Sequence, residues 1–218
     1  MRELEDLFRH LGNRGFRPRT VIDVGVAHGT HALYAQFPDA YYHLFEPVAE
    51  FEKDIRWHLT RLRGEYWPVA LSDKPGVQSL FLTGQSDGAS LMHSDVPPEN
   101  PQLRQVEVST LDTAFKDKTV EGPILLKTDC QGADLKVIQG GLNFVTHCDV
   151  IVLEVGMFHY WGPSTPDFTD VIRYMADIGF VTYDVVGHMD RPRDGALGQV
   201  DVAFVKRDGM FRDSHKWS

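Results

Sequence analysis

The stretch VIDVGVAHGTHALYAQF, from Val21 to Phe37, decides how the fold of this chain is predicted. VIDVGVA is rich in β-branched residues and almost free of charge, which is typical of a strand buried on both faces. Gly25 and Gly29 follow it, and the next residues read as a helix that ends at Pro38. A strand, a glycine turn and a helix in this order are either a ligand-binding unit or only a tight connection.

Strand-like and helix-like segments alternate on the C-terminal side of this unit. The alternation favours a doubly wound α/β fold with a mostly parallel, seven-stranded sheet covered by helices on both faces. The last two strand-like segments, 181–187 and 200–207, are expected to form an antiparallel pair at one edge. The parallel strands are expected to end near Gly25, Glu46, Ala70, Asp129 and Glu154, with 65–73 as one short strand and 133–145 as one helix.

The length of 218 residues suits one domain spanning 1–218, in which residues 1–19 form an N-terminal helical extension. Residues 77–83 and 104–111 alternate like antiparallel or edge strands. Between them lies a polar stretch rich in Gly, Ser, Asp and Pro. A loop of this length in a compact domain is usually functional, so residues 84–102 are predicted to form a mobile substrate loop.

Charge and composition exclude several classes of protein. The net charge of −9 disfavours a nucleic-acid partner, since phosphate binding requires a basic surface. The two cysteines have neither a disulfide framework nor metal-ligand spacing, which indicates a reducing compartment. The charged N-terminus does not resemble a signal peptide, and no stretch approaches the length of a membrane span. A cytoplasmic protein without a membrane partner is therefore expected.

The glycine turn fits one cofactor pattern better than another. The dinucleotide pattern G-x-G-x-x-G fails at two positions when it starts from Gly25, which weakens a prediction of NAD binding. The pattern acid-x-G-x-G-x-G fits at Asp23, Gly25 and Gly29, with Ala27 in place of the middle glycine. A side chain at Gly25 is expected to lie where the ligand binds.

Glu46 strengthens the ligand-binding interpretation of the turn. It ends the second strand, 21 residues after Gly25. A carboxylate at that place can bind both hydroxyls of a ribose through its two oxygens. The alternative is a solvated acid at a strand end.

From about Val21 to Gly156, most of its length, the chain resembles the FkbM-type methyltransferases. The resemblance is carried by VIDVGVAHGT, LFEP, VALSD, ASL, VSTLD, ILLKTDCQGADLKVIQG and IVLEV in this order. The resemblance implies a Rossmann-like class I fold that uses S-adenosyl-L-methionine, and an enzyme that methylates hydroxyl groups of sugars or secondary metabolites. It therefore implies a small-molecule or glycan acceptor. The chain departs from the family at one position: the usual Asp-x-Glu-Gly is Asp129-Cys130-Gln131-Gly132 here. The loss of a negative charge at Gln131 weakens any acid–base role for that position.

The family resemblance and the strand ends together give the expected cofactor site, in which Leu71 and Ser72 would lie near the adenine. Asp129 ends the strand next to the glycine turn, where it either binds the methionyl amino group or accepts the hydroxyl proton. The expected cofactor-binding residues are Asp23, Gly25, Ala27, His28, Gly29, Thr30, Glu46, Pro47, Leu71, Ser72 and Asp129.

Methyl transfer to a hydroxyl requires alignment of the acceptor and removal of a proton. The candidate catalytic residues are Asp129, Glu154 and His159, each with a structural alternative. Asp129 could instead cap the following helix, and Glu154 could pair with Lys127. His159 could simply pack among its aromatic neighbours.

Two hypotheses of function remain open at this point, an O-methyltransferase and a non-catalytic protein of the same fold that binds the cofactor or acts by interaction. Asp129 and Glu154 could ligate a divalent cation, but no third ligand is evident, so no metal is predicted.

Overall fold

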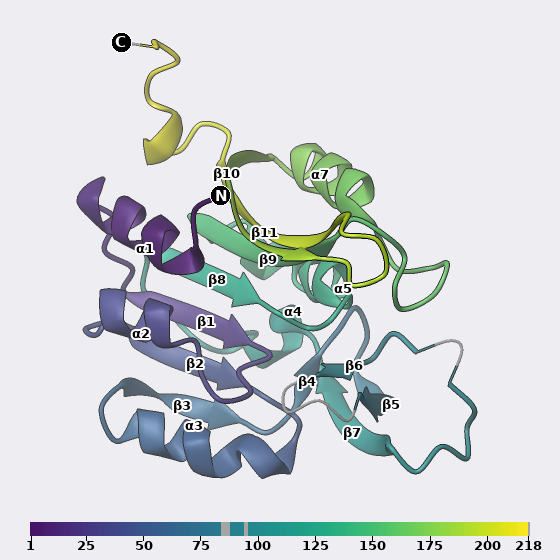
Figure 1. Cartoon of the computed structure of the whole chain (residues 1–218). Helices are drawn as coiled ribbons and strands as arrows, with labels where there is room; N and C mark the ends of the chain where they lie inside the picture. Colours follow the sequence, from purple (N-terminus) through teal and green to yellow (C-terminus); the bar gives the residue numbers. More distant parts are fainter. Residues whose placement is uncertain (84–87, 94–95, 218) are drawn as a thin grey trace.

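A seven-stranded sheet forms the centre of the computed structural model, which describes residues 1–83, 88–93 and 96–217 (Figure 1). Its strand order is β10-β11-β9-β8-β1-β2-β3. The five strands from β9 to β3 are parallel, and β11 lies antiparallel between β9 and β10. The predicted mostly parallel sheet with an antiparallel edge pair is therefore confirmed. The strands are β1 (Thr20–Val24), β2 (Tyr41–Phe45), β3 (Arg63–Trp67), β8 (Ile124–Thr128), β9 (Val150–Gly156), β10 (Phe180–Asp190) and β11 (Leu197–Lys206).

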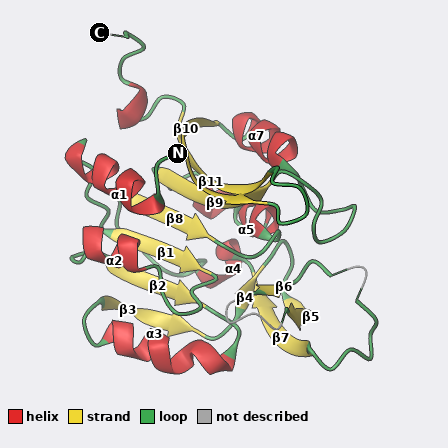
Figure 2. Cartoon of the chain, in the orientation of Figure 1, coloured by secondary structure: helices red, strands yellow, loops and turns green. Residues whose placement is uncertain are grey.

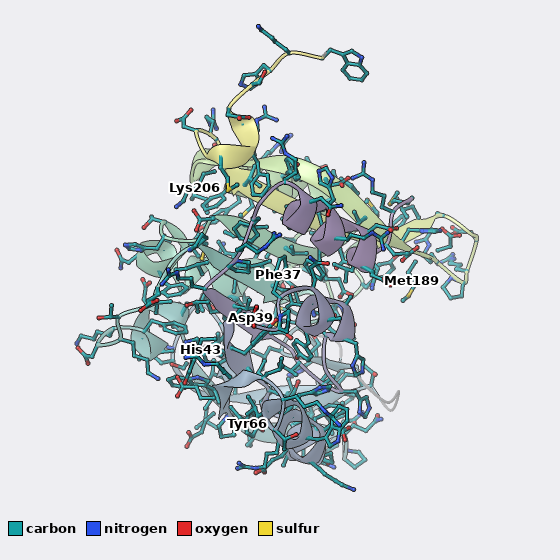
Figure 3. All side chains as sticks on the ribbon, turned by 90° about the vertical axis from the view of Figure 1, so that its left-hand side faces the viewer. Phe37, Asp39, His43, Tyr66, Met189 and Lys206 are labelled. Atoms are coloured by element: carbon teal, nitrogen blue, oxygen red, sulfur yellow. The ribbon has the colours of Figure 1, made fainter. Side chains whose placement is uncertain are left out.

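Helices cover both faces of this sheet (Figure 2). One buried core lies between the sheet and α1 (Leu4–Asn13), α2 (His31–Gln36) and α3 (Glu52–Leu59). Figure 3 faces the amino ends of the parallel strands, where Asp39 precedes β2. Among the described residues, no helix is long and apolar enough to cross a membrane.

A second buried core lies on the opposite face of the sheet, against α4 (Leu111–Ala114), α5 (Asp134–Gln139), α6 (Leu142–Val145) and α7 (Phe168–Asp177). The chain also forms two short 3₁₀ helices, η1 (Ala49–Phe51) and η2 (Met210–Arg212).

The alternation of side chains along each strand explains why charged residues lie inside the sheet. Val21 of β1 belongs to the core under α1 and α2, while Val24 belongs to the core on the opposite face. Asp23 therefore shares a face with Val21. The register pairs Asp23 with Lys127 of β8, so the two buried charges are neighbours. The same alternation in β9 places Glu154 on this face, close to its carboxyl end.

The third strand differs from its prediction. β3 ends at Trp67, and Ala70–Leu71 forms β4 of a separate four-stranded sheet with the order β4-β7-β5-β6. Pro68 lies between them and has no backbone N–H to donate to a ladder, which favours the end of the strand there. The expectation of one strand over 65–73 is therefore wrong.

The small sheet lies where the arrowheads of β1, β2 and β8 point (Figure 1). β5 (Gly76–Leu82) and β7 (Leu103–Ser109) pair antiparallel, as their alternation predicted. β6 (Ala89–Ser90) falls within the predicted substrate loop 84–102. Residues 84–87 and 94–95 of that loop lie outside the described residues.

The helix predicted over 133–145 is interrupted. α5 ends at Gln139, and α6 begins at Leu142 after two glycines. A Cβ atom at Gly140 would overlap the backbone oxygen of Ser72. The close approach of the β4 segment therefore requires glycine at this position and separates the two helices.

Candidate functional site

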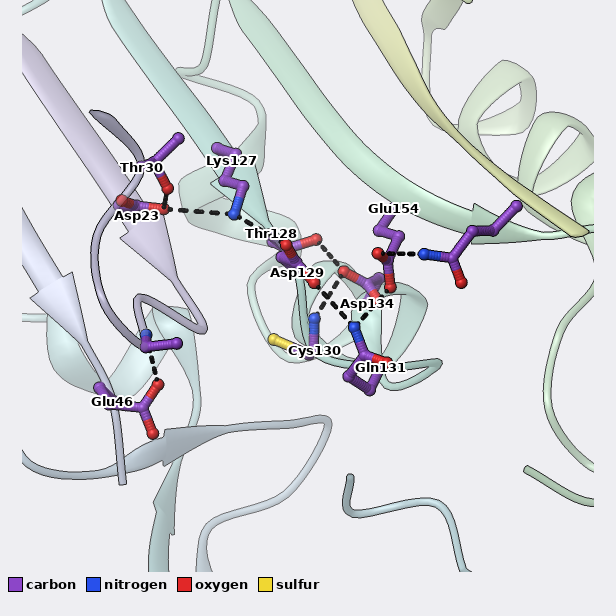
Figure 4. Close-up of polar contacts among 12 residues, drawn as sticks. Asp23, Thr30, Glu46, Lys127, Thr128, Asp129, Cys130, Gln131, Asp134 and Glu154 are labelled. Carbon is purple, nitrogen blue, oxygen red and sulfur yellow. Dashed lines mark hydrogen bonds and ion pairs between the residues drawn. The ribbon is translucent and has the colours of Figure 1, made fainter. Parts of the chain in front are cut away.

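A cavity of about 710 Å³ opens at the carboxyl ends of β1, β2, β8 and β9. It is bounded by the glycine turn after β1, by the small sheet, and by the turn 129–132 after β8. The volume is in the range of pockets that hold small ligands or cofactors. Figure 4 shows the polar residues along one side of it.

The backbone of the glycine turn supports this opening. Gly25 has a φ of 75°, and a Cβ atom there would overlap the backbone oxygen of Asp129. The expectation that a side chain at Gly25 would fill the ligand position is therefore wrong, because it would strike the neighbouring turn first. Ala27 has a φ of 44°, a left-handed conformation that glycine adopts more readily. The position at which this chain departs from the glycine pattern thus keeps the backbone conformation of a glycine.

Glu46 is anchored to the glycine turn. One carboxylate oxygen accepts the backbone N–H of Ala27 and the other accepts the N–H of Val48, each over 2.9 Å. The side chain is buried but lines the cavity, and burial raises the pKa of its carboxyl group. Each oxygen retains a lone pair for a second donor, so the carboxylate is able to bind two adjacent hydroxyl groups.

Asp23 stabilises the turn from within the protein. It is fully buried, and it is not among the described residues that line the cavity. The hydroxyl group of Tyr34 donates to one of its carboxylate oxygens over 2.8 Å and that of Thr30 donates to the other over 3.2 Å. The ammonium group of Lys127 lies 3.8 Å from Oδ1 of Asp23, the oxygen to which Thr30 donates. Burial raises the pKa of Asp23, and Lys127 opposes this effect.

Lys127 lines the cavity and lies between two acids, Asp23 and Asp129. Its Nζ donates to Oδ2 of Asp129 over 3.2 Å. Burial alone would lower the pKa of Lys127, but the carboxylates of Asp129, Asp23 and Asp201 raise it above its usual value. Lys127 therefore stays protonated and offsets part of the negative charge. Within the described residues the ion pairs of Lys127 are with Asp23 and Asp129, so the structural alternative in which Glu154 pairs with Lys127 is wrong.

Gln131 connects Asp129 to Glu154 (Figure 4). Its Nε2 donates to Oδ1 of Asp129 over 3.1 Å and to Oε2 of Glu154 over 3.0 Å. The other oxygen of Glu154 accepts Nε2 of Gln199 over 2.7 Å. Burial, followed by the charges of neighbouring carboxylates, raises the pKa of Glu154 well above its usual value. Asp129 and Glu154 therefore form a pair of acids at the cavity wall: Asp129 also accepts from Lys127, whereas Glu154 also accepts from Gln199.

The capping alternative for Asp129 does not describe its contacts. α5 begins at Asp134 with Ala133 as its N-cap, and no side chain caps it. Asp134 instead accepts the hydroxyl of Thr128 over 2.5 Å and the N–H of Cys130 over 3.2 Å through one oxygen. Asp129 faces the cavity, where its carboxylate accepts hydrogen bonds from Lys127 and Gln131.

Most of the predicted site residues meet at this cavity, but three do not. Asp23 and Ser72 are fully buried, and Ser72 donates to Asp73 over 3.1 Å. His159 is exposed, and its Nδ1 lies 2.6 Å from the backbone oxygen of Thr165. None of the three is among the described lining residues. The predicted residues that line the cavity are Gly25, Ala27, His28, Gly29, Thr30, Glu46, Pro47, Leu71, Asp129 and Glu154.

Sequence reasoning missed several lining residues because they come from distant segments. Trp161 was considered only as a neighbour of His159, yet it lines the cavity beside Gly132. Gln199 comes from β11, and no motif marks it. Leu4 of α1 and Met189 of β10 also line the cavity, from elements that lie outside the quoted motifs. Within the described ranges, no three His, Cys, Asp or Glu side chains converge as a metal site.

Comparison with known proteins identifies the family. The family model described as the methyltransferase FkbM domain matches residues 23–182, from the glycine turn to β10. The chain belongs to this FkbM methyltransferase family. The prediction from the quoted motifs is thereby confirmed. No curated protein matches the chain.

Solved structures share the fold of this FkbM domain at low sequence identity. Magnesium protoporphyrin IX methyltransferase from Synechocystis PCC 6803, solved with bound SAM, is 8% identical with a TM-score of 0.50; 93% of this chain and 76% of that chain are covered. The 23S rRNA methyltransferase ErmE has 12% identity, a TM-score of 0.47, and coverages of 98% and 72%. An O-methyltransferase family protein from Burkholderia thailandensis is 12% identical with a TM-score of 0.49; 94% of this chain and 55% of that chain are covered.

Proposed function

We propose that this FkbM domain binds S-adenosyl-L-methionine in the cavity and transfers its methyl group to a hydroxyl of a small molecule or glycan. The observation that carries the proposal is the buried Glu46 carboxylate. Both of its oxygens are fixed by backbone N–H groups of the surrounding turns, and both retain a lone pair for a ribose hydroxyl. When bound, the cofactor supplies a methyl group already activated by a sulfonium charge.

The charge of the cavity favours this cofactor over NAD. Its described lining includes three acids, Glu46, Asp129 and Glu154, and one base, Lys127, which is paired with Asp129. A negative wall attracts the sulfonium and ammonium charges of S-adenosyl-L-methionine and repels the pyrophosphate of NAD. The donor set therefore fits a cationic adenosine cofactor.

Asp129 and Glu154 lie at different places along the cavity and suit different parts of the reaction. Asp129 adjoins the glycine turn, so it suits the methionyl end of the cofactor, whereas Glu154 lies one strand further along the sheet. Transfer would form the bond between the acceptor oxygen and the methyl carbon as the methyl–sulfur bond breaks, with that electron pair staying on sulfur. The proton of the acceptor O–H would pass to the Asp129–Glu154 pair. Burial raises the pKa of Glu154, which makes its carboxylate a stronger base than an exposed carboxylate. We assign the base to this pair rather than to the exposed His159.

The acceptor side combines an aromatic ring with amides. Trp161, Gln131 and Gln199 line the cavity next to Glu154. An indole ring beside hydrogen-bonding amides suits the apolar face and the hydroxyl groups of a sugar. The negative wall disfavours a phosphate-rich nucleic acid as acceptor. A non-catalytic protein of the same fold would not need two acids converging on one amide in the cavity.

Calorimetry tests the cofactor, and methyl transfer tests the reaction. S-adenosyl-L-methionine should bind with micromolar affinity, about −8 kcal/mol, while NAD should not bind. Methyl-labelled cofactor with a panel of glycans, sugar nucleotides and polyketide-type alcohols should then give a labelled acceptor. Tight NAD binding without binding of S-adenosyl-L-methionine would overturn the proposal. Cofactor binding with no transfer across the panel, and none to RNA, would favour the non-catalytic alternative.

A further inference from the structure

The Asp129–Glu154 pair has a donor at each of its four carboxylate oxygens. Lys127 donates to Oδ2 of Asp129, and Gln199 donates to Oε1 of Glu154. The remaining oxygens, Oδ1 of Asp129 and Oε2 of Glu154, share the Nε2 of Gln131. Two carboxylates that face one another repel unless something positive lies between them. In this chain the group between them is the N–H₂ of an amide.

The position of that amide is fixed by an uncommon backbone conformation. Gln131 has a φ of 49°, a left-handed conformation that a residue with a side chain seldom adopts and that strains the backbone. Its backbone oxygen accepts the hydroxyl of the buried Ser90 over 2.7 Å, so the small sheet holds the turn in this form. A strained residue held from outside its own turn indicates that its side chain has a defined task.

A divalent cation would make the same connection in a different way. Ca²⁺ and Mg²⁺ bind carboxylate oxygens at about 2.0–2.6 Å and often link two acids. The amide nitrogen lies 3.0 and 3.1 Å from the two oxygens, and its two hydrogens point to two acceptors without adding charge. We propose that Gln131 takes the place of a bridging divalent cation, so that this chain holds Asp129 and Glu154 together without a metal ion.

The surrounding charges agree with this assignment. The two carboxylates and the paired ammonium of Lys127 give the group a net charge of about −1 when both acids are ionised. A divalent cation added to the group would make it positive beside the predicted sulfonium. The amide leaves the wall negative and keeps every carboxylate oxygen hydrogen-bonded. This inference rests on the proposed function only in that the pair is taken to serve methyl transfer.

The test uses MnCl₂ as the probe, because Mn²⁺ binds carboxylate sites. Calorimetry is done on the full chain, on Gln131→Glu, and on the matched control Gln199→Glu. Gln131→Glu replaces the bridging donor by a third carboxylate, whereas Gln199→Glu adds the same charge on the side of Glu154 away from Asp129. The wild type should show no Mn²⁺ binding at the pair. Gln131→Glu should bind Mn²⁺ at least about tenfold more tightly than Gln199→Glu, a difference of about 1.4 kcal/mol.

A second variant decides the matter where Gln131→Glu does not fold. Gln131→Ala removes the amide and leaves space between the acids, so Mn²⁺ should raise its Tm and leave the Tm of Gln199→Ala unchanged. Wild-type binding of Mn²⁺ that disappears in Asp129→Asn would overturn the inference, as would the absence of any Mn²⁺ response in Gln131→Glu and Gln131→Ala. Titration of the same wild-type preparation with S-adenosyl-L-methionine separates this result from the proposed function, since cofactor binding is measured without the metal.

Discussion

The backbone N–H of Ala27 donates to the carboxylate of Glu46 over 2.9 Å, which joins the glycine turn after β1 to the end of β2. The two features that first indicated a cofactor site are therefore one structural unit. A substitution in the glycine turn should alter the position of the Glu46 carboxylate, and a substitution of Glu46 should alter the turn. The reason is that the carboxylate proposed to bind the ribose also fixes the turn beside it.

Glu46→Gln should weaken cofactor binding without unfolding the protein. The amide keeps the shape of the side chain, but its single oxygen can accept the N–H of only one of Ala27 and Val48. Its NH₂ group is a donor that would face the other N–H and could not accept a ribose hydroxyl. Calorimetry with S-adenosyl-L-methionine should show a loss of roughly 1–3 kcal/mol. Glu50→Gln removes an exposed acid of the same type from η1 and should bind as the wild type does. Equal affinities in the two variants would contradict the role of Glu46.

The turn should respond in opposite ways to exchanges at Gly25 and Ala27. Gly25→Ala introduces a Cβ against the backbone oxygen of Asp129 at a positive φ, and should lower the free energy of unfolding by roughly 2–4 kcal/mol. Ala27→Gly relieves a left-handed alanine, so stability should change by less than about 1 kcal/mol. Denaturant unfolding of both variants measures the difference. A larger loss in Ala27→Gly than in Gly25→Ala would show that the turn is fixed in another way.

Asp129→Asn should remain folded and lose turnover by about 10²–10⁴-fold, because the pair that accepts the proton loses a carboxylate. The measurement is single-turnover methyl transfer to an acceptor from the panel, with a thermal melt of the same preparation. Asp201→Asn is the matched control. It removes another carboxylate that acts on Lys127, but Asp201 is not among the described residues lining the cavity. Similar turnover in the two variants would place the base elsewhere.

The stability of the protein should depend on pH through Asp134. Burial raises its pKa from 3.8 to about 6, and one of its buried oxygens has no hydrogen-bond partner among the described residues. The stability linked to its protonated form is complete below the unfolded pKa and is lost as the pH rises through about 6. Asp134→Asn does not titrate, so its free energy of unfolding relative to the wild type should rise by about 2–3 kcal/mol between about pH 4 and pH 7. A constant difference between the two proteins over this interval would mean that Asp134 ionises normally.

The sequence by itself determined the order of the main sheet elements and the place of the cofactor turn. Local composition is sufficient for this, because a strand buried on both faces must be apolar along its length and a turn that approaches another backbone must contain glycine. The strand β1, Gly25 and Glu46 could be identified in this way. The spacing of the quoted motifs was sufficient to identify the family.

Only the tertiary structure decided which side chains share the cavity. Gln131 meets Glu154 across 23 positions of sequence, and Gln199 meets Glu154 across 45. No local pattern encodes such contacts, because they depend on the order and register of strands that are distant in the chain. The same holds for Asp23. The motif predicts that it binds the cofactor, but the alternation of side chains along β1 buries it beside Lys127. Periodicity predicts that a residue is inside, whereas the packing of neighbouring strands decides what it touches there.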